Sequence, residues 1–463
     1  MTTSLVPVDV HALAEPRRGL GVGFGARFFI ALLLGLIWLI PAWWSPRLAA
    51  GMLLWDALVF AVWLFDLFRL PPPSSITAGR AWKTAPILAR ESSVRIEIRN
   101  CGRLSLRAAL VDEAPRALLS RLPLLRACLP PGAMIPLEYE IQPNERGDAR
   151  FGDLFFRYST MLGLAERWAV VRLAQTVRVM PDLIEARDQA LYLIRSRQVE
   201  MEKRHRRQPG VGREFESLRD YREGDDPSDI CWPATARRHQ LTMRVFEAER
   251  SQVIWVVVDA GRLMRAQIQD ARRAAPLSKL DYAVNAALSI AQVAMQCGDH
   301  VGLLAYGRSL QAAAAPSRGP RHLRTLVDAL AQVRSEAAEA NHALAAGALL
   351  QRQTKRSLVV WITDFAETPA APEVIESVLR MGHRHLVMFA AVSQPDLTAL
   401  AQAIPQSEEA MFRHAAAQEI VQRRELLIRG LRRSGVLALE QYPGSLTSSL
   451  VNQYLEIKDR GRL

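Results

Sequence analysis

The sequence lacks the short motifs that mark most enzyme classes. It contains no GxxxxGK(S/T) phosphate loop, no HExxH zinc motif, no GxSxG nucleophile motif and no pair of catalytic carboxylates at a recognisable spacing. His383 and His385 have no carboxylate or cysteine beside them in the sequence to orient their rings, so we interpret them as ordinary surface or core histidines. These absences favour a protein that is not an enzyme and has no catalytic residues.

Cysteine is scarce as well. The four cysteines, Cys101, Cys128, Cys231 and Cys297, lie far apart and show neither a CxxC pair nor a Cys/His spacing. This pattern predicts no disulfide framework and no zinc site, and it favours a reducing compartment. Basic charge is abundant by contrast. The formal net charge of +12 is compatible with nucleic acid, an anionic membrane surface or an acidic protein as a partner.

Two long apolar runs lie near the N-terminus, from Phe28 to Trp44 and from Leu48 to Leu67. Each is close to the length of roughly 20 residues at which a helix crosses a bilayer. The short connection between them predicts a transmembrane helical hairpin with both outer ends on one side of the membrane. Basic residues flank the outer ends, and only Arg47 lies in the connection; the flanking residues are Arg17, Arg18, Arg27, Arg69, Arg80 and Lys83. By the positive-inside rule, the bulk of the chain is then cytoplasmic.

Asp56 falls near the middle of the second run. A carboxylate at that depth costs about 2.5 to 3.5 kcal/mol on insertion scales. One interpretation is a contact with a partner helix. The other, which we favour because the rest of the run is apolar, is a tolerated carboxylate that is protonated or faces the first run.

The segment after the three prolines Pro71, Pro72 and Pro73 has the pattern of a small β-sandwich. Short runs of period two, such as Ser93 to Asn100 and Ile135 to Pro143, are separated by glycine and proline. The basic run Lys203 to Arg207 follows this segment. It is either a site for phosphates or lipid headgroups, or, as we favour, a solvated linker, because no aromatic residues are interleaved.

Beyond residue 250, apolar runs alternate with helical patterns in the order of a doubly wound parallel sheet. The candidate strands are Val253 to Val258, Val301 to Tyr306, Leu358 to Ile362, Leu386 to Ala391 and Val436 to Leu439, with Arg308 to Ala314 as an antiparallel edge. The candidate helices are Lys279 to Gln296, Arg321 to Val333, Ala410 to Arg432 and Leu446 to Ile457. Ligands of such sheets bind beyond the carboxyl ends of the strands. Asp259 and Asp364 each follow a strand, so their placement predicts a metal or partner site.

A dense polar motif precedes the first of these strands. Its members are Arg219, Tyr221, Gly224, Asp225, Asp226, Pro227, Trp232 and Arg237. Gly224 permits a tight turn, the two aspartates can close that turn on their own backbone, and the arginines can pair with the carboxylates. The motif is therefore either a salt-bridged brace that docks the linker onto the sheet or a partner-binding surface, and the residues alone do not choose between them.

The strands and their aspartates resemble the von Willebrand factor A-type domain, whose metal-ion-dependent adhesion site has Asp-x-Ser-x-Ser after its first strand and an Asp after a later one. More narrowly, the segments EFESLRDYREGDDPSDICWPATAR and VVVDAGRLM, with NQYLEIKDRGRL at the end, are similar to the bacterial family named domain of unknown function 58. Members of that family commonly carry a membrane hairpin, a β-rich segment and a von Willebrand-like domain. The resemblance implies a protein of the bacterial inner membrane that works with a MoxR-type AAA+ ATPase.

The sequence departs from the adhesion motif at both serine positions, which hold Gly261 and Leu263, and Cys231 stands where family members often have Asp. Magnesium prefers about six oxygens in octahedral geometry, and two carboxylates with waters make a poor cage. We therefore expect no cofactor, with Mg²⁺ at Asp259 and Asp364 as the alternative.

These observations predict five parts. They are a cytoplasmic tail (1–27), a transmembrane hairpin (28–70), a β-rich, immunoglobulin-like domain (71–185), a linker with the polar motif (186–250) and a von Willebrand-like α/β domain (251–463).

Three hypotheses on function follow. The leading one is a multi-pass, membrane-anchored, non-catalytic adaptor. It contacts the lipid bilayer, the ATPase and other membrane or cytoplasmic proteins during complex assembly, remodelling or envelope stress, and it needs no nucleic acid. The alternative is a membrane-tethered basic binder of nucleic acid or anionic lipid, and the third is a metal-dependent hydrolase at Asp259 and Asp364.

Overall fold

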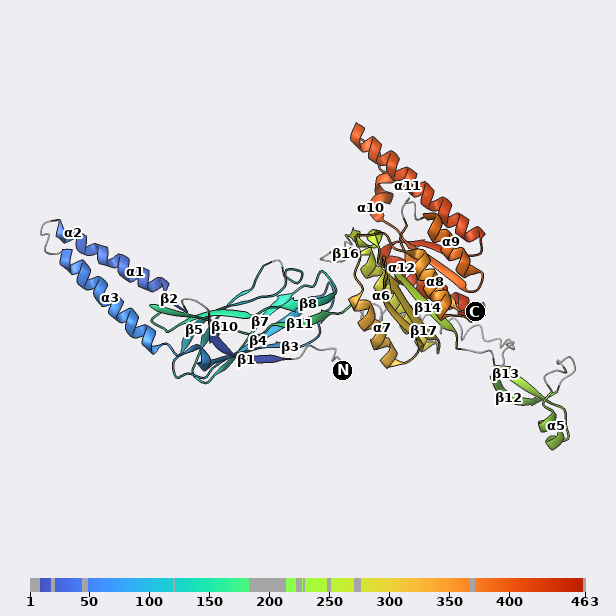
Figure 1. Ribbon diagram of the computed structural model, residues 1–463, viewed down its shortest axis with the longest axis horizontal. Coiled ribbons are helices and arrows are strands. Elements are labelled where there is room, and N and C mark those ends of the chain that lie inside the picture. Colours follow the sequence, from blue (N-terminus) through green and yellow to red (C-terminus); the bar gives the residue numbers. More distant parts are fainter. Residues whose placement is uncertain are drawn as a thin grey trace. The chain divides into compact units, whose positions relative to one another are not determined.

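The computed structural model describes residues 9–17, 21–43, 49–119, 121–182, 214–221, 227, 230–247, 251–269, 276–365 and 371–460. The chain divides into two compact units, Met1–Met180 and Pro181–Leu463 (Figure 1). The first consists mostly of strands and carries the apolar helices. The second is a mixed α/β unit.

The first unit is built on a nine-stranded antiparallel sheet in the order β6-β5-β9-β10-β1-β3-β4-β7, with β2 paired to β10. Its strands are β1 (Val10–Pro16), β2 (Val22–Phe24), β3 (Ile76–Trp82), β4 (Ser92–Asn100), β5 (Leu106–Asp112), β6 (Leu124–Leu129), β7 (Met134–Ile141), β9 (Leu154–Ser159) and β10 (Ala165–Val171). A separate pair joins β8 (Gly147–Phe151) and β11 (Gln175–Val179). Alternate residues of β4 are buried, as the period-two pattern predicts.

The stretch that we predicted as an N-terminal tail contributes β1 and β2 to this sheet. β1 pairs with β3 on one side and β10 on the other. Gly79 makes room for it, because a Cβ at that position would lie 1.9 Å from the His11 ring. The sequence hides this strand because Val10 is its only β-branched residue.

Arg80 also differs from the prediction that counted it among the charges flanking the membrane. Its side chain is fully buried and paired with Asp112. It is a core residue of the sheet and does not belong to the basic surface near the apolar helices.

The two apolar runs are helical, but they differ in continuity. The first comprises α1 (Ala26–Leu34), the 3-10 turn η1 (Gly35–Trp38) and the short α2 (Leu39–Ala42), whereas the second is the single helix α3 (Ala49–Arg69). In the described part of the chain, one helix, Ala50–Arg69, is long and apolar enough to cross a membrane, and Ala26–Trp38 is a shorter apolar helix. The predicted pair of full-length spans is therefore supported for one member.

The two runs pack against each other. The Trp55 indole nitrogen donates to the Ala31 carbonyl oxygen at 2.8 Å, and a Cβ on Gly35 would lie 2.7 Å from the Trp55 ring. Asp56 lies on this same inner side, because that Cβ would also come within 3.0 Å of Asp56 Oδ1. Its Oδ1 is buried and accepts no hydrogen bond. This placement agrees with the interpretation that Asp56 faces the first run.

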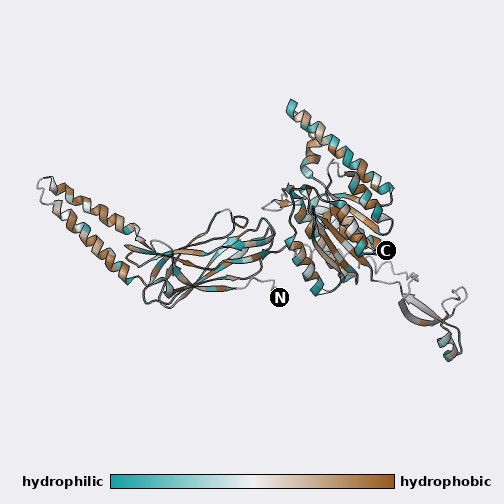
Figure 2. Ribbon diagram, viewed as in Figure 1, coloured by the Kyte–Doolittle hydropathy of each residue, from teal (hydrophilic) through white to brown (hydrophobic). Residues whose placement is uncertain are grey.

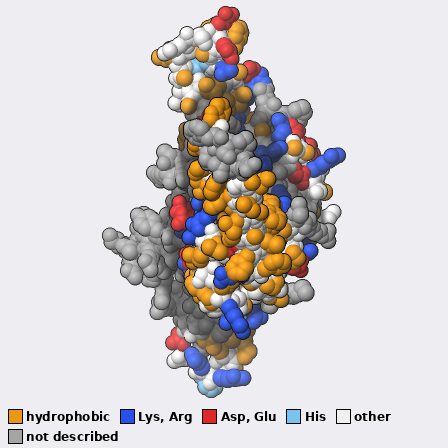
Figure 3. Space-filling view, turned by 90° about the vertical axis from the view of Figure 1, so that its left-hand side faces the viewer, with side chains coloured by type: hydrophobic (Ala, Val, Ile, Leu, Met, Phe, Trp, Pro, Cys, Tyr) orange, Lys and Arg blue, Asp and Glu red, His pale blue; other side chains and the backbone are white. Residues whose placement is uncertain are grey.

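The outward side of this helical pair is apolar (Figures 2 and 3). Leu53 and Leu54 are each 72% exposed, and Ile40 is 64% exposed. An apolar surface of this extent is rare on soluble monomers and marks contact with a membrane or a partner.

The second unit is built on a six-stranded sheet in the order β18-β17-β14-β19-β20-β21. Its strands are β14 (Val253–Asp259), β17 (His300–Tyr306), β18 (Leu310–Ser317), β19 (Leu358–Thr363), β20 (Leu386–Val392) and β21 (Leu437–Gln441). All neighbours are parallel except the antiparallel edge strand β18. All five parallel strands and the antiparallel edge confirm the predictions to within a few residues.

The helices of this unit are α6 (Lys279–Gln296), α7 (Pro320–Gln332), α8 (His342–Arg352), α9 (Ala371–Gly382), α10 (Pro395–Gln402), α11 (Glu408–Arg433) and α12 (Pro443–Asp459). Trp255, Trp361 and Phe389 form the centre of a buried cluster to which α8, α9 and α11 contribute apolar side chains. Four of the helices were predicted. The other three helices, α8, α9 and α10, are short, and their sequence patterns were not sufficient to predict them.

Candidate functional site

Asp259 and Asp364 lie at one edge of the parallel sheet. β14 and β19 are neighbours in register, with Val258 opposite Ile362, so each aspartate ends or follows its strand at the carboxyl edge. Both side chains are buried, Asp259 to 2% and Asp364 to 4% exposure. A buried carboxylate needs a cation or hydrogen-bond donors to compensate for lost solvation, and the two aspartates are compensated differently.

Asp364 is held between two cations. Lys279 Nζ lies 2.5 Å from Asp364 Oδ2, and Arg424 Nη1 lies 2.7 Å from Asp364 Oδ1. Arg424 also donates to Glu440 Oε1 at 3.0 Å and to the Phe365 carbonyl oxygen at 2.8 Å. Both oxygens of Asp364 are therefore engaged by basic side chains of the same chain.

Asp259 receives only neutral donors. Its Oδ1 accepts the Gly261 backbone N–H at 2.7 Å, and its Oδ2 accepts the Thr363 hydroxyl at 2.6 Å. Burial raises the pKa of Asp259 to about 7, the two hydrogen bonds oppose that rise, and the Asp364 charge adds to it. The two carboxylates of the predicted site thus have different electrostatic environments.

Lys279 reaches Asp364 because of how α6 begins. Ser278 caps the helix by accepting from the Asp281 backbone N–H, and Asp281 in turn accepts from Ser278. Lys279 is then the first helical residue. A cation at the N-terminus of a helix is unfavourable because it opposes the helix dipole. Its presence indicates an acidic partner, and this signal was not used in predicting the site. Arg424 was also missed, because its place in the middle of a long helix looked like an ordinary solvent-facing position.

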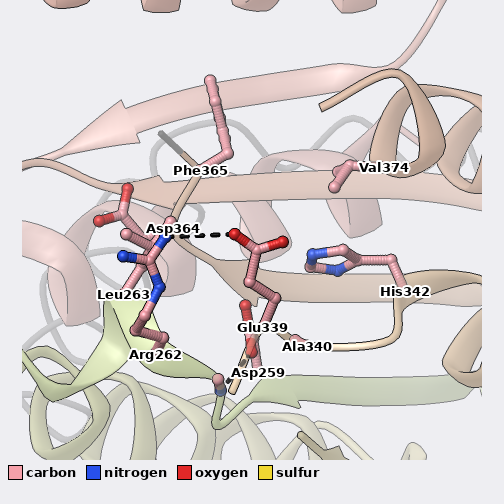
Figure 4. Close-up of a pocket in the computed structure, with 10 residues that line it drawn as sticks. Asp259, Arg262, Leu263, Glu339, Ala340, His342, Asp364, Phe365 and Val374 are labelled. Atoms are coloured by element: carbon pink, nitrogen blue, oxygen red, sulfur yellow. Dashed lines mark hydrogen bonds and ion pairs between the residues drawn. The ribbon is translucent and has the colours of Figure 1, made fainter. Parts of the chain in front are cut away.

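A small pocket opens beside Asp259 and Asp364 (Figure 4). It has room for about 30 Å³, which suffices for only a few water molecules. Arg262 and Glu339 form an ion pair at 3.2 Å on its rim, and both side chains are about half exposed. The pocket is suited to a few waters or a protruding side chain and is too small for a metabolite.

His342 lines the same pocket and belongs to a buried hydrogen-bond chain. The Trp361 indole donates to Tyr306 Oη at 2.7 Å, which leaves the Tyr306 hydroxyl proton for His342 Nδ1, 2.8 Å away. Burial lowers the pKa of His342 to about 4. His342 is therefore neutral near pH 7. This hydrogen-bond chain could not be predicted from the sequence, because its three members come from three different elements.

The residues at this edge do not fit a magnesium ion. Asp364 has no free oxygen, because Lys279 and Arg424 hold both. Gly261 stands at the first serine position, where even a Cβ would lie 2.8 Å from Ala340 and 3.1 Å from Asp259 Oδ1. Within the described ranges, no group of three or more His, Cys, Asp or Glu side chains is placed to hold a metal.

The polar motif lies in and around a small β-hairpin. β12 (Glu214–Asp220) pairs antiparallel with β13 (Thr242–Glu247), and α5 (Trp232–Arg238) lies between them in the chain. The Tyr221 backbone N–H donates to the Leu241 carbonyl oxygen at 2.9 Å, and the Arg219 backbone lies in β12 opposite Met243. The motif therefore surrounds a local β-hairpin rather than continuing the large sheet.

Trp232 is the most exposed aromatic residue of this motif, at 65%. It begins α5, and Arg237 is exposed in the last turn of that helix. Pro227 is within the described residues, whereas Gly224, Asp225 and Asp226 lie outside them, as does the basic run Lys203 to Arg207. The brace and the partner-binding surface both stay predictions.

The two histidines set aside in the sequence are placed without neighbouring catalytic groups. His385 is buried and its Nδ1 lies 3.1 Å from the Ser357 hydroxyl, and burial lowers its pKa. His383 is exposed.

Comparison with solved structures finds distant likenesses, two of which are as follows. Conserved hypothetical protein BatB from Bacteroides thetaiotaomicron is 12% identical, over 45% of this chain and 100% of that chain, with a TM-score of 0.28. An uncharacterized membrane spanning protein from Vibrio fischeri is 14% identical, over 30% of this chain and 69% of that chain, with a TM-score of 0.18. TM-scores this low establish no shared fold.

Among curated proteins there is no match. A family model described as "Protein of unknown function DUF58" matches residues 217–424. The matched segment begins within β12 and ends at Arg424, so it contains both aspartates of the sheet edge and the whole polar motif. This match confirms, over residues 217–424, the resemblance to the domain of unknown function 58 family that was noted in the sequence.

Proposed function

We propose that the protein is a membrane-anchored, non-catalytic adaptor of the bacterial inner membrane. Its second unit is a von Willebrand factor A-like domain on the cytoplasmic side, and it works with a MoxR-type AAA+ ATPase on other proteins. The observation that carries the proposal is the carboxyl edge of the parallel sheet. Asp364 is paired there with two basic side chains, and Asp259 is held by neutral hydrogen-bond donors. The pocket beside them has room for little more than water.

The anchor is supported by how the apolar runs join the first unit. β2 leads directly into α1, and α3 leads through η3 (Pro73–Ser75) into β3, so both outer ends of the helical pair start from one sheet. A pair of helices that leaves and re-enters the same sheet has both ends on one side of a bilayer. Their exposed apolar side chains match the hydrocarbon core, and we propose that both runs cross it.

The absence of catalysis is supported by the chemistry of the sheet edge. A general base or nucleophile must reach substrate. Lys279, Arg424 and Asp364 are instead buried and saturated with each other. Asp259 is buried beneath Gly261 and Thr363. The side chains on the rim, Arg262 and Glu339, form an ion pair of the kind that contributes to recognition between proteins.

The partner surface that we favour lies around Trp232. Exposed tryptophan and arginine side chains dominate the affinity of protein interfaces, and the motif presents Trp232 and Arg237 on one short helix. The family resemblance supplies the ATPase as the partner. The ATPase would perform the work, and this chain would supply membrane location and contact with other proteins.

A binding assay tests this proposal. The full chain in lipid nanodiscs is mixed with a MoxR-type ATPase from the same organism, with ATP present, and association is measured. We expect saturable association, and Trp232→Ala is expected to weaken it by about tenfold or more. Trp168→Ala, which removes an exposed tryptophan of the first unit, is the matched control and should bind as the wild type does.

Asp225→Ala then separates the two interpretations of the motif. A brace predicts a lower melting midpoint, whereas a binding surface predicts lost association at an unchanged midpoint. No association of the wild type in the presence of nucleotide would refute the adaptor. Binding to RNA or anionic vesicles that collapses steeply with salt would favour the basic binder instead.

A further inference from the structure

Lys279 is the most deeply buried charged side chain at the carboxyl edge, with 1% of its surface exposed. Its Nζ contacts Asp364 Oδ2 at 2.5 Å and lies 3.5 Å from Gln394 Oε1. Three elements meet at this nitrogen: the start of α6, the residue after β19 and the residue before α10. A single positive charge thus joins segments that are far apart in the sequence.

The Lys279 ammonium has the same electrostatic role as the divalent ion of an adhesion-type site. Such an ion binds carboxylates that follow neighbouring strands and compensates for their buried negative charge. Here the ammonium of Lys279 and the guanidinium of Arg424 do this for Asp364, from opposite oxygens. The hydroxyl ligands that a metal would need are missing at Gly261 and Leu263.

We infer that Lys279 is a built-in cation that takes the place of the divalent ion at this sheet edge. The recognition surface above it is consequently organised without metal. Because the lysine is part of the chain and cannot dissociate as an ion does, the surface does not respond to the concentration of Mg²⁺ or Mn²⁺. Any carboxylate of a partner must be bound by exposed groups of the rim, such as Arg262, because no metal is there to coordinate it.

The Lys279 side chain also fills the space in which an ion would lie. If its side chain is shortened to a serine, Asp364 Oδ2 and Gln394 Oε1 lose their cation, and the new hydroxyl adds an oxygen beside them. These oxygens are the ligand type that Mg²⁺ and Mn²⁺ prefer. The shortened variant should therefore acquire a divalent-ion response that the wild type lacks.

Thermal unfolding of the full chain in nanodiscs, without any partner, tests this inference independently of the adaptor proposal. The wild type should melt at the same temperature in EDTA and in excess Mg²⁺ or Mn²⁺. Lys279→Met, which keeps most of the side-chain length and removes the charge, should lower the midpoint of the second unit by about 10 °C. Lys355→Met, at an exposed position of the same unit, should leave it unchanged. Lys279→Ser should be destabilised in EDTA and recover part of the loss with Mg²⁺ or Mn²⁺.

Each arm can overturn the inference. A rise in the wild-type midpoint with either ion, or saturable binding of one ion per wild-type chain by calorimetry, shows that a metal is used. A Lys279→Met protein that melts with the wild type shows that the charge is not needed. A Lys279→Ser protein that ignores both ions at all concentrations shows that the lysine does not fill an ion site. If either Lys279 variant does not fold, the wild-type metal titration still decides.

Discussion

Individual side chains at the sheet edge divide into two groups by how their burial is compensated. Asp364, Lys279 and Arg424 form an ionic cluster in which removal of one member leaves the others uncompensated, a loss that costs about 3 to 5 kcal/mol in buried pairs. Asp259 and His342 are instead kept near neutrality by burial. Polar groups that stay uncharged in the folded protein make its stability depend on pH, because the unfolded chain ionises at ordinary pKa values.

His342 gives a prediction of this kind. Its folded pKa of about 4 lies below the ordinary value of 6.5, so between these values the unfolded chain binds a proton that the folded chain does not. The contribution of His342 to the free energy of unfolding is at its full value above pH 6.5. It falls by about 3 kcal/mol as the pH is lowered to 4. Burial of Asp259 acts in the opposite direction over the same pH range, because its raised pKa makes the folded chain bind a proton that the unfolded chain does not. Urea unfolding of the second unit should therefore show the loss as a difference: between pH 6.5 and 4 the wild type should lose about 3 kcal/mol relative to His342→Gln.

The control for that experiment is His383→Gln, which changes an exposed histidine. Its free energy of unfolding should follow that of the wild type at every pH. If the wild type and His342→Gln lose stability in parallel between pH 6.5 and 4, then His342 is not held neutral by its surroundings and the hydrogen-bond chain through Tyr306 has been misassigned.

At the scale of elements, the helical pair is tied to the strand unit through one turn. Asp66, in the last turn of α3, is fully buried and accepts from the Thr160 hydroxyl and from the Leu164 and Ala165 backbone N–H groups. Arg27, at the start of α1, donates to two carbonyl oxygens of the same turn between β9 and β10. These hydrogen bonds hold the helical pair against the sheet at this junction.

Asp66→Asn should loosen the junction. An amide replaces a carboxylate that accepts three hydrogen bonds, and the weakened bonds to a charged group are each worth about 1.5 to 3 kcal/mol. Hydrogen exchange of the Leu164 and Ala165 amides should accelerate by about tenfold to a hundredfold. Asp148→Asn, which removes an exposed pairing with Arg178, should leave those amides as protected as in the wild type; acceleration in both variants would show that the effect is not local.

The burial and pairing of each strand decide whether it could be predicted from the sequence. The strands β14, β17, β19 and β20 were predictable because burial on both faces gives a continuous apolar run. β1 was not, because its partners are supplied by β3 and β10, far along the chain. The ionic cluster was not predicted for the same reason. Lys279 and Asp364 are 85 residues apart in the sequence, and Arg424 and Asp364 are 60 residues apart. Local pattern reports burial well, but it does not report which buried charges meet.

The whole molecule combines an apolar helical pair, a strand unit and an α/β unit in one basic chain. The basic side chains Arg27 and Arg69 are exposed at the outer ends of the helical pair, whereas Arg80 is withdrawn into the core. The charge asymmetry across the predicted membrane therefore rests on fewer residues than the sequence suggested, although its sign is the same. If the helical pair crosses the membrane as proposed, both units lie on the cytoplasmic side and the connection between the helices lies on the other.

Labelling of cysteines in spheroplasts with a membrane-impermeant maleimide tests this requirement most directly. Cys101 and Cys128 are exposed on the first unit and report its side of the membrane without any change to the chain, and Arg47→Cys reports the connection. The account predicts that Cys101 and Cys128 react only after the membrane is permeabilised, while the cysteine introduced by Arg47→Cys reacts in intact spheroplasts. Reaction of Cys101 or Cys128 from outside, or protection of the introduced cysteine until permeabilisation, would contradict it.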